Sequence, residues 1–117
     1  MADRKRVPAR FYQTDGGTEP VREWLKSLDK RNRLLIGTDI KTVEYGWPIG
    51  MPVCRPMGKG LYEVRTNLPG KKIARVLFCI AGSEMVLLHG FLKKTQRTPK
   101  SDLDLALDRK RRLEAAN

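Results

Sequence analysis

Five basic side chains of this sequence have types and spacing suited to chemistry on a phosphate. They are Arg65, Arg75, His89, Lys93 and Lys94. Arginine forks match phosphate oxygens two at a time and stay charged, and a suitably placed histidine or lysine can move protons. The set fits metal-independent RNA cleavage, in which the 2′-hydroxyl attacks the adjacent phosphate and the protein stabilises the added negative charge.

These residues fall on stretches that alternate like β-strands, in which side chains two apart share a face. The alternation groups Glu63 with Arg65 and His89 with Lys93. We therefore expect one face of a sheet to lie on the core under helices. The other face should present Glu63, Arg65, Arg75 and Lys93 or His89, provided that the register brings them together.

Each of these residues also has a plainer interpretation. Arg65 and Glu63 are equally well explained as an ion pair on a solvated face. Lys93 and its neighbour are typical of a solvated strand end, and a histidine between apolar residues, like His89, is more often a core residue. Arg75 is harder to explain in this way, because it interrupts an apolar strand.

Positive charge is concentrated in one segment of the chain. Of a net charge of +11, residues 51–98 carry +7, because nine basic residues there face only two acidic ones. A surplus needed only for solubility has no reason to gather in one segment, so the placement favours a polyanionic partner such as RNA. The basic residues expected to bind the RNA backbone are Arg55, Lys59, Lys71, Lys72 and Arg97.

The composition excludes several classes of protein. The 117 residues predict a single domain over 1–117, and no membrane span is expected because the longest apolar run, 76–81, is too short. Cys54 and Cys79 lack CxxC spacing and are expected to be reduced core thiols, while a lone histidine argues against zinc. The N-terminus has no signal-peptide pattern. We expect a cytoplasmic protein without metal or cofactor.

The N-terminal third predicts a strand followed by two helices. Residues 10–14 are rich in strand formers and end at a turn, Asp15-Gly16-Gly17. Thr18 is the expected N-cap of a first helix, and Asp29 that of a second helix ending at Gly46. Their apolar stripes consist of Val21, Trp24, Leu25 and Leu28, and of Ile36, Ile40 and Val43. Helices joined this tightly form an antiparallel hairpin.

The rest of the chain predicts a sheet and one more helix. A short edge strand at 53–55 and strands at 61–67, 73–81 and 85–92 are separated by turns, which is typical of an antiparallel meander. Ser101 and Asp104 have the spacing of a capping box for a C-terminal helix. The order β-α-α-β-β-β-β-α predicts an α+β fold with an N-terminal strand and helical hairpin packed on an antiparallel sheet.

Three of these stretches resemble the RelE/HigB superfamily of bacterial toxins, also called the RelE/ParE superfamily. They are GLYEVR at 60–65, ARVLF at 74–78 and LLHGFLKKTQRTP at 87–99, of which the last is the most specific. The helix TEPVREWLKSL at 18–28 also fits. The chain looks most like the phage-derived, HigB-like branch, and the resemblance covers about Arg10 to Arg112.

The resemblance implies a RelE-like α+β fold and the toxin of a type II toxin–antitoxin system. Such a toxin is an endoribonuclease that cuts mRNA in the ribosomal A site without metal. Its implied partners are mRNA, the ribosome and a HigA-like antitoxin with a helix-turn-helix domain. Arg65 matches the sheet arginine of the family, Lys93 and Lys94 its basic residues after the last strand, and Arg75 a recurring basic position of this branch.

Two points stay open at this stage. The chain lacks the tyrosine that RelE has after the lysines, so His89 and Lys93 are both candidates for protonating the leaving 5′-oxygen. The same scaffold also hosts ParE-like gyrase inhibitors, and a non-catalytic RNA-binding module would show the same charge pattern.

Overall fold

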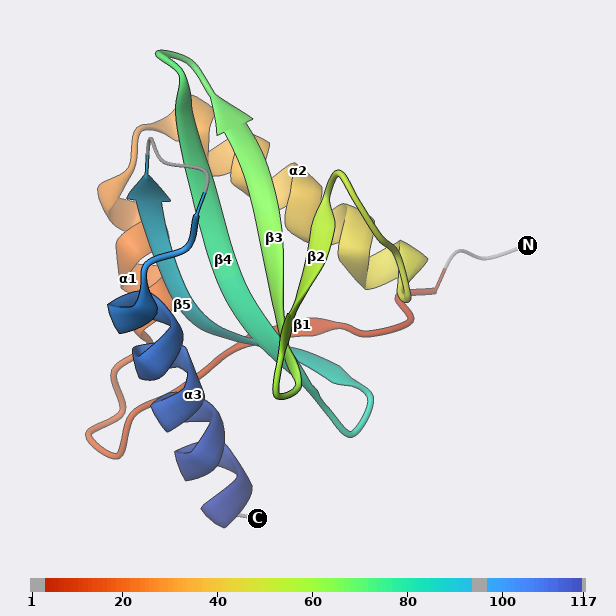
Figure 1. Ribbon diagram of the computed structural model, residues 1–117, viewed down its shortest axis with the longest axis vertical. Helices are drawn as coiled ribbons and strands as arrows, with labels where there is room; N and C mark the ends of the chain where they lie inside the picture. Colours follow the sequence, from red (N-terminus) through yellow and green to blue (C-terminus); the bar gives the residue numbers. More distant parts are fainter. Residues whose placement is uncertain (1–3, 94–96, 117) are drawn as a thin grey trace.

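The fold is α+β, as the order of elements predicts. The computed structural model describes residues 4–93 and 97–116, which form a five-stranded sheet with helices on both faces (Figure 1). In chain order the elements are β1 (Ala9–Phe11), α1 (Pro20–Ser27), α2 (Lys30–Gly46), β2 (Cys54–Gly58), β3 (Leu61–Leu68), β4 (Lys72–Ala81), β5 (Glu84–Lys93) and α3 (Lys100–Ala115).

The strands lie in the order β1-β5-β4-β3-β2. The predicted antiparallel meander is confirmed for β2 to β5, including the short strand at the edge. One correction concerns β1, which runs parallel to β5, with Ala9 opposite Met85. The sheet is therefore mixed. Parallel strands need a long crossover connection, which the chain between β1 and β5 provides.

The two N-terminal helices form where the sequence predicts them, but Thr18 as the N-cap of the first helix is wrong. Asp29 caps α2, since its carboxylate accepts a hydrogen bond from the Asn32 amide at 2.8 Å. α1 begins at Pro20, with Glu19 rather than Thr18 at the N-cap position. Proline suits the start of a helix because its φ is already helical and it has no N–H to leave unpaired.

The capping box predicted for α3 is wrong. The helix begins at Lys100, with Pro99 at the N-cap position and no side-chain cap. Asp104 instead lies one turn after Lys100 and accepts a hydrogen bond from its ammonium at 2.8 Å. Ser101 therefore lies inside the first turn of the helix, where its side chain is not at the capping position.

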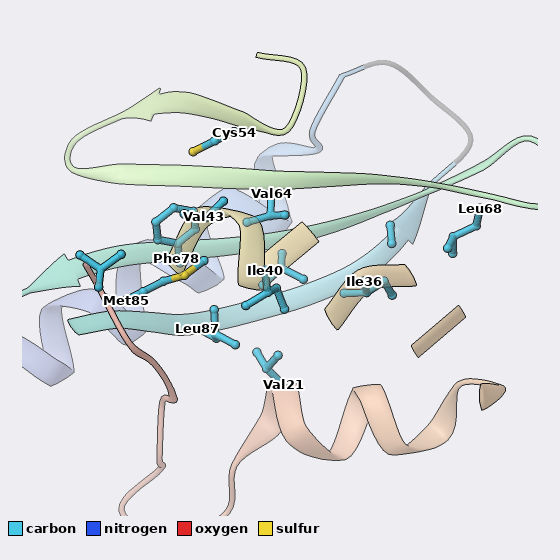
Figure 2. Close-up of a cluster of buried hydrophobic side chains, with 13 residues drawn as sticks. Val21, Ile36, Ile40, Val43, Cys54, Val64, Leu68, Phe78, Met85 and Leu87 are labelled. Atoms are coloured by element: carbon cyan, nitrogen blue, oxygen red, sulfur yellow. The ribbon is translucent and has the colours of Figure 1, made fainter. Parts of the chain in front are cut away.

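One face of the sheet packs against α1 and α2. Figure 2 shows the side chains that fill this layer, among them Val21 of α1, Ile36, Ile40 and Val43 of α2, and Val64, Phe78 and Leu87 of the sheet. The helix residues are those of the predicted stripes. Burial of this apolar layer is the main favourable contribution to folding.

The opposite face of the sheet is covered in part by α3, which lies in front of the strands in Figure 1. A second, smaller cluster lies there, built from Tyr12, Leu61, Leu77, Cys79, Val86, Leu88, Phe91 and Ala106. The face that was expected to be open is therefore half core. Among the described residues, exposed side chains of this face include Lys93 and Asn67 near the β3–β4 turn and Arg55 on the edge strand.

The two cysteines are buried on opposite faces of the sheet, Cys54 in the layer under α2 and Cys79 in the layer under α3. Burial, with a smaller effect of Glu63, raises the pKa of the Cys54 thiol to about 11. Both are therefore inert thiols at neutral pH. Among the described residues no three His, Cys, Asp or Glu side chains cluster as metal ligands would, and none of the described helices is long and apolar enough to cross a membrane.

Candidate functional site

The sheet register brings the predicted basic residues together on the face that α3 partly covers. Arg65 on β3 lies directly opposite Arg75 on β4, and Arg75 lies opposite Phe91 on β5. Two residues further along the strands, Asn67, Ile73 and Lys93 form the next row. The expected convergence of Arg65, Arg75 and Lys93 is thus present.

A third row lies on the other side of Arg65 and Arg75. It consists of Glu63, Leu77 and His89, and Arg55 of β2 lies opposite Glu63. A β-bulge between Leu77 and Phe78 shifts the β4–β5 register, so that Leu88 and His89 both lie on the α3 side. His89 and Lys93 therefore stand on either side of the row that holds Arg65.

Burial divides the basic residues into two groups. The side chains of Arg75 and Glu63 are both 0% exposed, and the Arg75 Nη1 atom lies 3.1 Å from a Glu63 carboxylate oxygen. The sequence suggested Arg65 as a partner of Glu63; in the structure the guanidinium on Glu63 is that of Arg75. A buried guanidinium is not open to a substrate phosphate, so in this structure Arg75 supports the sheet from within.

Thr98 completes this buried cluster. Its hydroxyl accepts a hydrogen bond from Arg75 Nη1 at 3.1 Å and donates a short one to the Glu63 carboxylate. Sequence reasoning did not single out Thr98, although it lies in the Thr-Pro end of the stretch at 87–99. The hydroxyl joins the segment before α3 to the middle of the sheet, and so it helps to hold α3 on this face.

His89 has a specific partner that the sequence did not suggest. Its Nε2 atom lies 2.7 Å from the carboxylate of Asp102 in the first turn of α3, and the two side chains are 16% and 18% exposed. The imidazole also stacks on Phe91, with ring centroids 5.3 Å apart. The only signal in the sequence was an acidic residue in the first turn of a helix, which the helix dipole alone would explain.

Arg65 and Lys93 form the accessible part of the site. Arg65 is half-buried and Lys93 is exposed, as are Lys71 and Lys72 at the β3–β4 turn. With strands about 4.8 Å apart and about 3.3 Å per residue, the backbones of Arg65 and Lys93 are roughly 12 Å apart, within reach of one phosphate for two long side chains. Lys94 lies outside the described residues.

Comparison with protein families identifies the family of this chain. Residues 23–111 match the family described as phage derived protein Gp49-like (DUF891). The chain belongs to this Gp49-like family. The match runs from α1 into α3 and so includes Arg65, Arg75, His89, Lys93 and Lys94. Gp49-like proteins are RelE-like and toxin-like and are associated with toxin–antitoxin systems, which implies an antitoxin partner. No curated protein matches the chain.

The remaining predicted RNA-binding residues of this Gp49-like chain are spread over its surface. Arg55 and Arg97 are exposed, on the edge strand β2 and directly before Thr98. Lys59 lies in the β2–β3 turn, at the other end of β3 from Lys71. The residue after it, Gly60, lies close to the Lys110 side chain of α3. Lys71 and Lys72 lie at the β3–β4 turn, the end of the sheet at which Asn67 and Lys93 also lie.

Some of the cavities lined by described residues lie away from this site. One, of about 510 Å³, follows the outer surface of α2 and is lined by Lys30, Arg31, Leu34, Leu35 and Thr38. Another, of about 320 Å³, lies between the segment after β1 and α3, where Tyr12 and Arg109 line it. A third, of about 350 Å³, is lined by residues between Trp47 and Tyr62, among them Cys54. None of these three is lined by Arg65, Arg75, His89 or Lys93.

Proposed function

We propose that this Gp49-like chain is the toxin of a type II toxin–antitoxin system, of the HigB-like branch. Its activity is metal-independent cleavage of mRNA on the ribosome. A single domain over residues 1–117 carries this activity. The observation that supports the proposal is that half-buried Arg65 and exposed Lys93 lie on adjoining rows of one sheet face, with Lys71 and Lys72 exposed at the β3–β4 turn.

In this mechanism Arg65 holds the scissile phosphate through its guanidinium, which also stabilises the charge that develops on the phosphate oxygens. His89 and Lys93 exchange protons with the attacking 2′-oxygen and the leaving 5′-oxygen, and Lys94 extends the basic surface. Arg75 acts indirectly, because its guanidinium is buried against Glu63. Arg55, Lys59, Lys71, Lys72 and Arg97 contribute long-range attraction for the RNA backbone.

The partners follow from charge and family. A chain of net charge +11 attracts RNA and the ribosome, and equally an acidic antitoxin. A HigA-like antitoxin with a helix-turn-helix domain is the proposed partner, in the cytoplasm. No cofactor is needed, because the 2′-hydroxyl supplies the nucleophile.

One observation favours a second candidate, a non-catalytic RNA-binding module. Arg65, Arg75 and Phe91 form the central row of this face. Because Arg75 is buried, Arg65 is the arginine of this row that RNA can reach. Such a module would bind RNA in a salt-dependent way and leave it intact. A gyrase inhibitor of the ParE type, by contrast, would damage DNA and need no RNA contact.

The deciding experiment compares Arg65→Ala with Arg22→Ala. Arg22 is an exposed arginine of α1, on the other side of the sheet. Induction of the wild-type chain and of Arg22→Ala should arrest growth and produce cut transcripts. Arg65→Ala should cut at least about 10²-fold more slowly, the usual cost of removing one group that stabilises transition-state charge.

Folding of each variant is checked by circular dichroism and thermal melting. Intact transcripts bound to the wild-type chain would favour the binding module, and DNA damage without cut transcripts would favour gyrase inhibition. Undiminished cleavage by a folded Arg65→Ala protein would contradict the role given to Arg65.

A further inference from the structure

We propose that Asp102 is a positioning residue for His89. Its carboxylate keeps a hydrogen on Nε2 of the imidazole, which leaves Nδ1 as the nitrogen that accepts the proton of the RNA 2′-hydroxyl. This inference rests on the proposed ribonuclease function and assigns the base that the sequence leaves open.

The contacts around the two side chains support a fixed ring. An imidazole nitrogen 2.7 Å from a carboxylate oxygen must carry the hydrogen, because an ionised carboxylate only accepts. Phe91 stacks on the ring and limits its rotation. Each side chain is less than one-fifth exposed, so water competes weakly for this hydrogen bond.

Two basic side chains of α3 have partners other than Asp102. The nearest lysine in sequence, Lys100, is bonded to Asp104, and Arg109, further along α3, donates to the Leu88 carbonyl oxygen at 2.8 Å. The first turn of α3 also stabilises an anion at that position through the helix dipole. Asp102 is therefore in place to accept the hydrogen of the imidazole, which is what holding one tautomer requires.

The rows of the sheet place His89 and Lys93 on opposite sides of the row that holds Arg65, the proposed ligand of the phosphate. His89 and Lys93 are four residues apart on β5, or about 13 Å along the strand, and the row of Arg65 runs between them. In an in-line displacement the attacking and leaving oxygens also lie on opposite sides of phosphorus. This geometry separates the two proton transfers.

The step balances as follows. The 2′-oxygen forms a bond to phosphorus while the bond from phosphorus to the 5′-oxygen breaks. His89 Nδ1 accepts the 2′-hydroxyl proton, and the Lys93 ammonium gives a proton to the 5′-oxygen. The products are a 2′,3′-cyclic phosphate and a 5′-hydroxyl, without any other reactant.

The first test is independent of activity. His89 is the only histidine of the chain, so ¹⁵N NMR of the imidazole reports one residue. In the wild-type protein, with the ring neutral, the hydrogen should be on Nε2. Asp102→Asn should give a mixture of tautomers, since an amide can donate as well as accept. Asp104→Asn is the matched control and should leave the spectrum unchanged.

The second test measures cleavage of an mRNA on ribosomes. Asp102→Asn and His89→Gln should each lower kcat on the order of 10²-fold, the usual contribution of general base catalysis, and KM should stay within about twofold. Asp104→Asn should match the wild type. Combining Asp102→Asn with His89→Gln should lower kcat no further than His89→Gln alone, because Asp102 acts through His89.

The outcomes separate this inference from the proposed function. If Asp102→Asn or His89→Gln cleaves normally while Arg65→Ala does not, the inference is overturned and the ribonuclease stands. A wild-type hydrogen on Nδ1 would also overturn it. If the wild type cuts no RNA at all, the ribonuclease function fails, and the tautomer measurement alone then shows only whether Asp102 holds the ring.

Discussion

At the scale of single residues, the two arginines of the central row differ in what surrounds them. Arg75 is fully buried with Glu63 and Thr98, whereas Arg65, directly opposite on β3, is half-buried. An arginine in an apolar strand suggested a functional task, and the structure provides a partner for it within the protein. Glu63 also offsets the charge of Arg75, so that Arg65 can lie beside another guanidinium.

Removing one member of this buried pair should be costly. Arg75→Met would leave the Glu63 carboxylate buried with only the Thr98 hydroxyl, and we expect the free energy of unfolding to fall by about 3–5 kcal/mol. Urea unfolding of the purified protein measures this loss. An Arg75→Met variant as stable as the wild type would show that the Arg75–Glu63 pair does not stabilise the protein.

The matched control removes both charges. Glu63→Leu combined with Arg75→Met should recover most of the loss, because no charge is then buried alone. This double variant also tests whether Arg75 contacts RNA. Cleavage by the folded double variant means that it does not, and a folded but inactive one would point to a direct role.

At the scale of elements, α1 packs on β5 through a very close contact. A Cβ atom added to Gly90 would lie 2.4 Å from the Trp24 ring, too close for any real contact. Glycine at this position therefore allows the indole to lie directly on the strand backbone. The contact joins the helical hairpin to the strand that carries His89 and Lys93.

Gly90→Ala should lower the free energy of unfolding by about 1–3 kcal/mol, the typical cost of overpacking a core. Gly37→Ala is the control, because Gly37 is an exposed residue of α2 and a Cβ atom added there would meet no atom within 4 Å. That change should stabilise by about 0.5–1 kcal/mol through helix propensity. Thermal melting compares the two, and equal melting temperatures for both variants would contradict the argument.

Most elements were predictable from the sequence, because their signals are local. The stripe of α2, its Asp29 cap and the meander of β2 to β5 depend on spacings within a few residues. The parallel pairing of β1 with β5 was missed because it joins residues far apart in the chain. The start of α3 was misplaced because Pro99 and Ser101 compete for the same helix end.

The site was predictable only in part, for the same reason. Alternation put Arg65, Arg75 and Lys93 on one face, and the register agrees. Alternation does not show which part of that face another element covers. Thr98 and Asp102 reach the sheet only because α3 folds back over it, and so the buried cluster and the partner of His89 could not be foreseen.

At the scale of the whole molecule, positive charge surrounds the accessible end of the site. If Lys71 and Lys72 contact RNA phosphates, Lys71→Ala with Lys72→Ala should weaken binding and lower the slope of log K against log salt by about 1.4, or about 0.7 per contact with single-stranded RNA. Fluorescence anisotropy with a labelled oligonucleotide at several salt concentrations measures the slope.

Lys26→Ala with Lys30→Ala makes the same change in net charge on the other side of the sheet, where α1 and α2 lie. This pair should leave the slope near its wild-type value. A similar loss of slope in both double variants would mean that overall charge governs binding, rather than the end of the sheet that holds Arg65 and Lys93.

The pairing of β1 with β5 also constrains the order in which the chain can assemble. Ala9 has no strand to join until Met85 has been made and placed beside β4, so the first strand synthesised is among the last to dock. Closing so long a loop is entropically unfavourable and slows folding. A nascent chain that stops before β5 therefore lacks both the anchor for its N-terminus and the strand that holds His89 and Lys93.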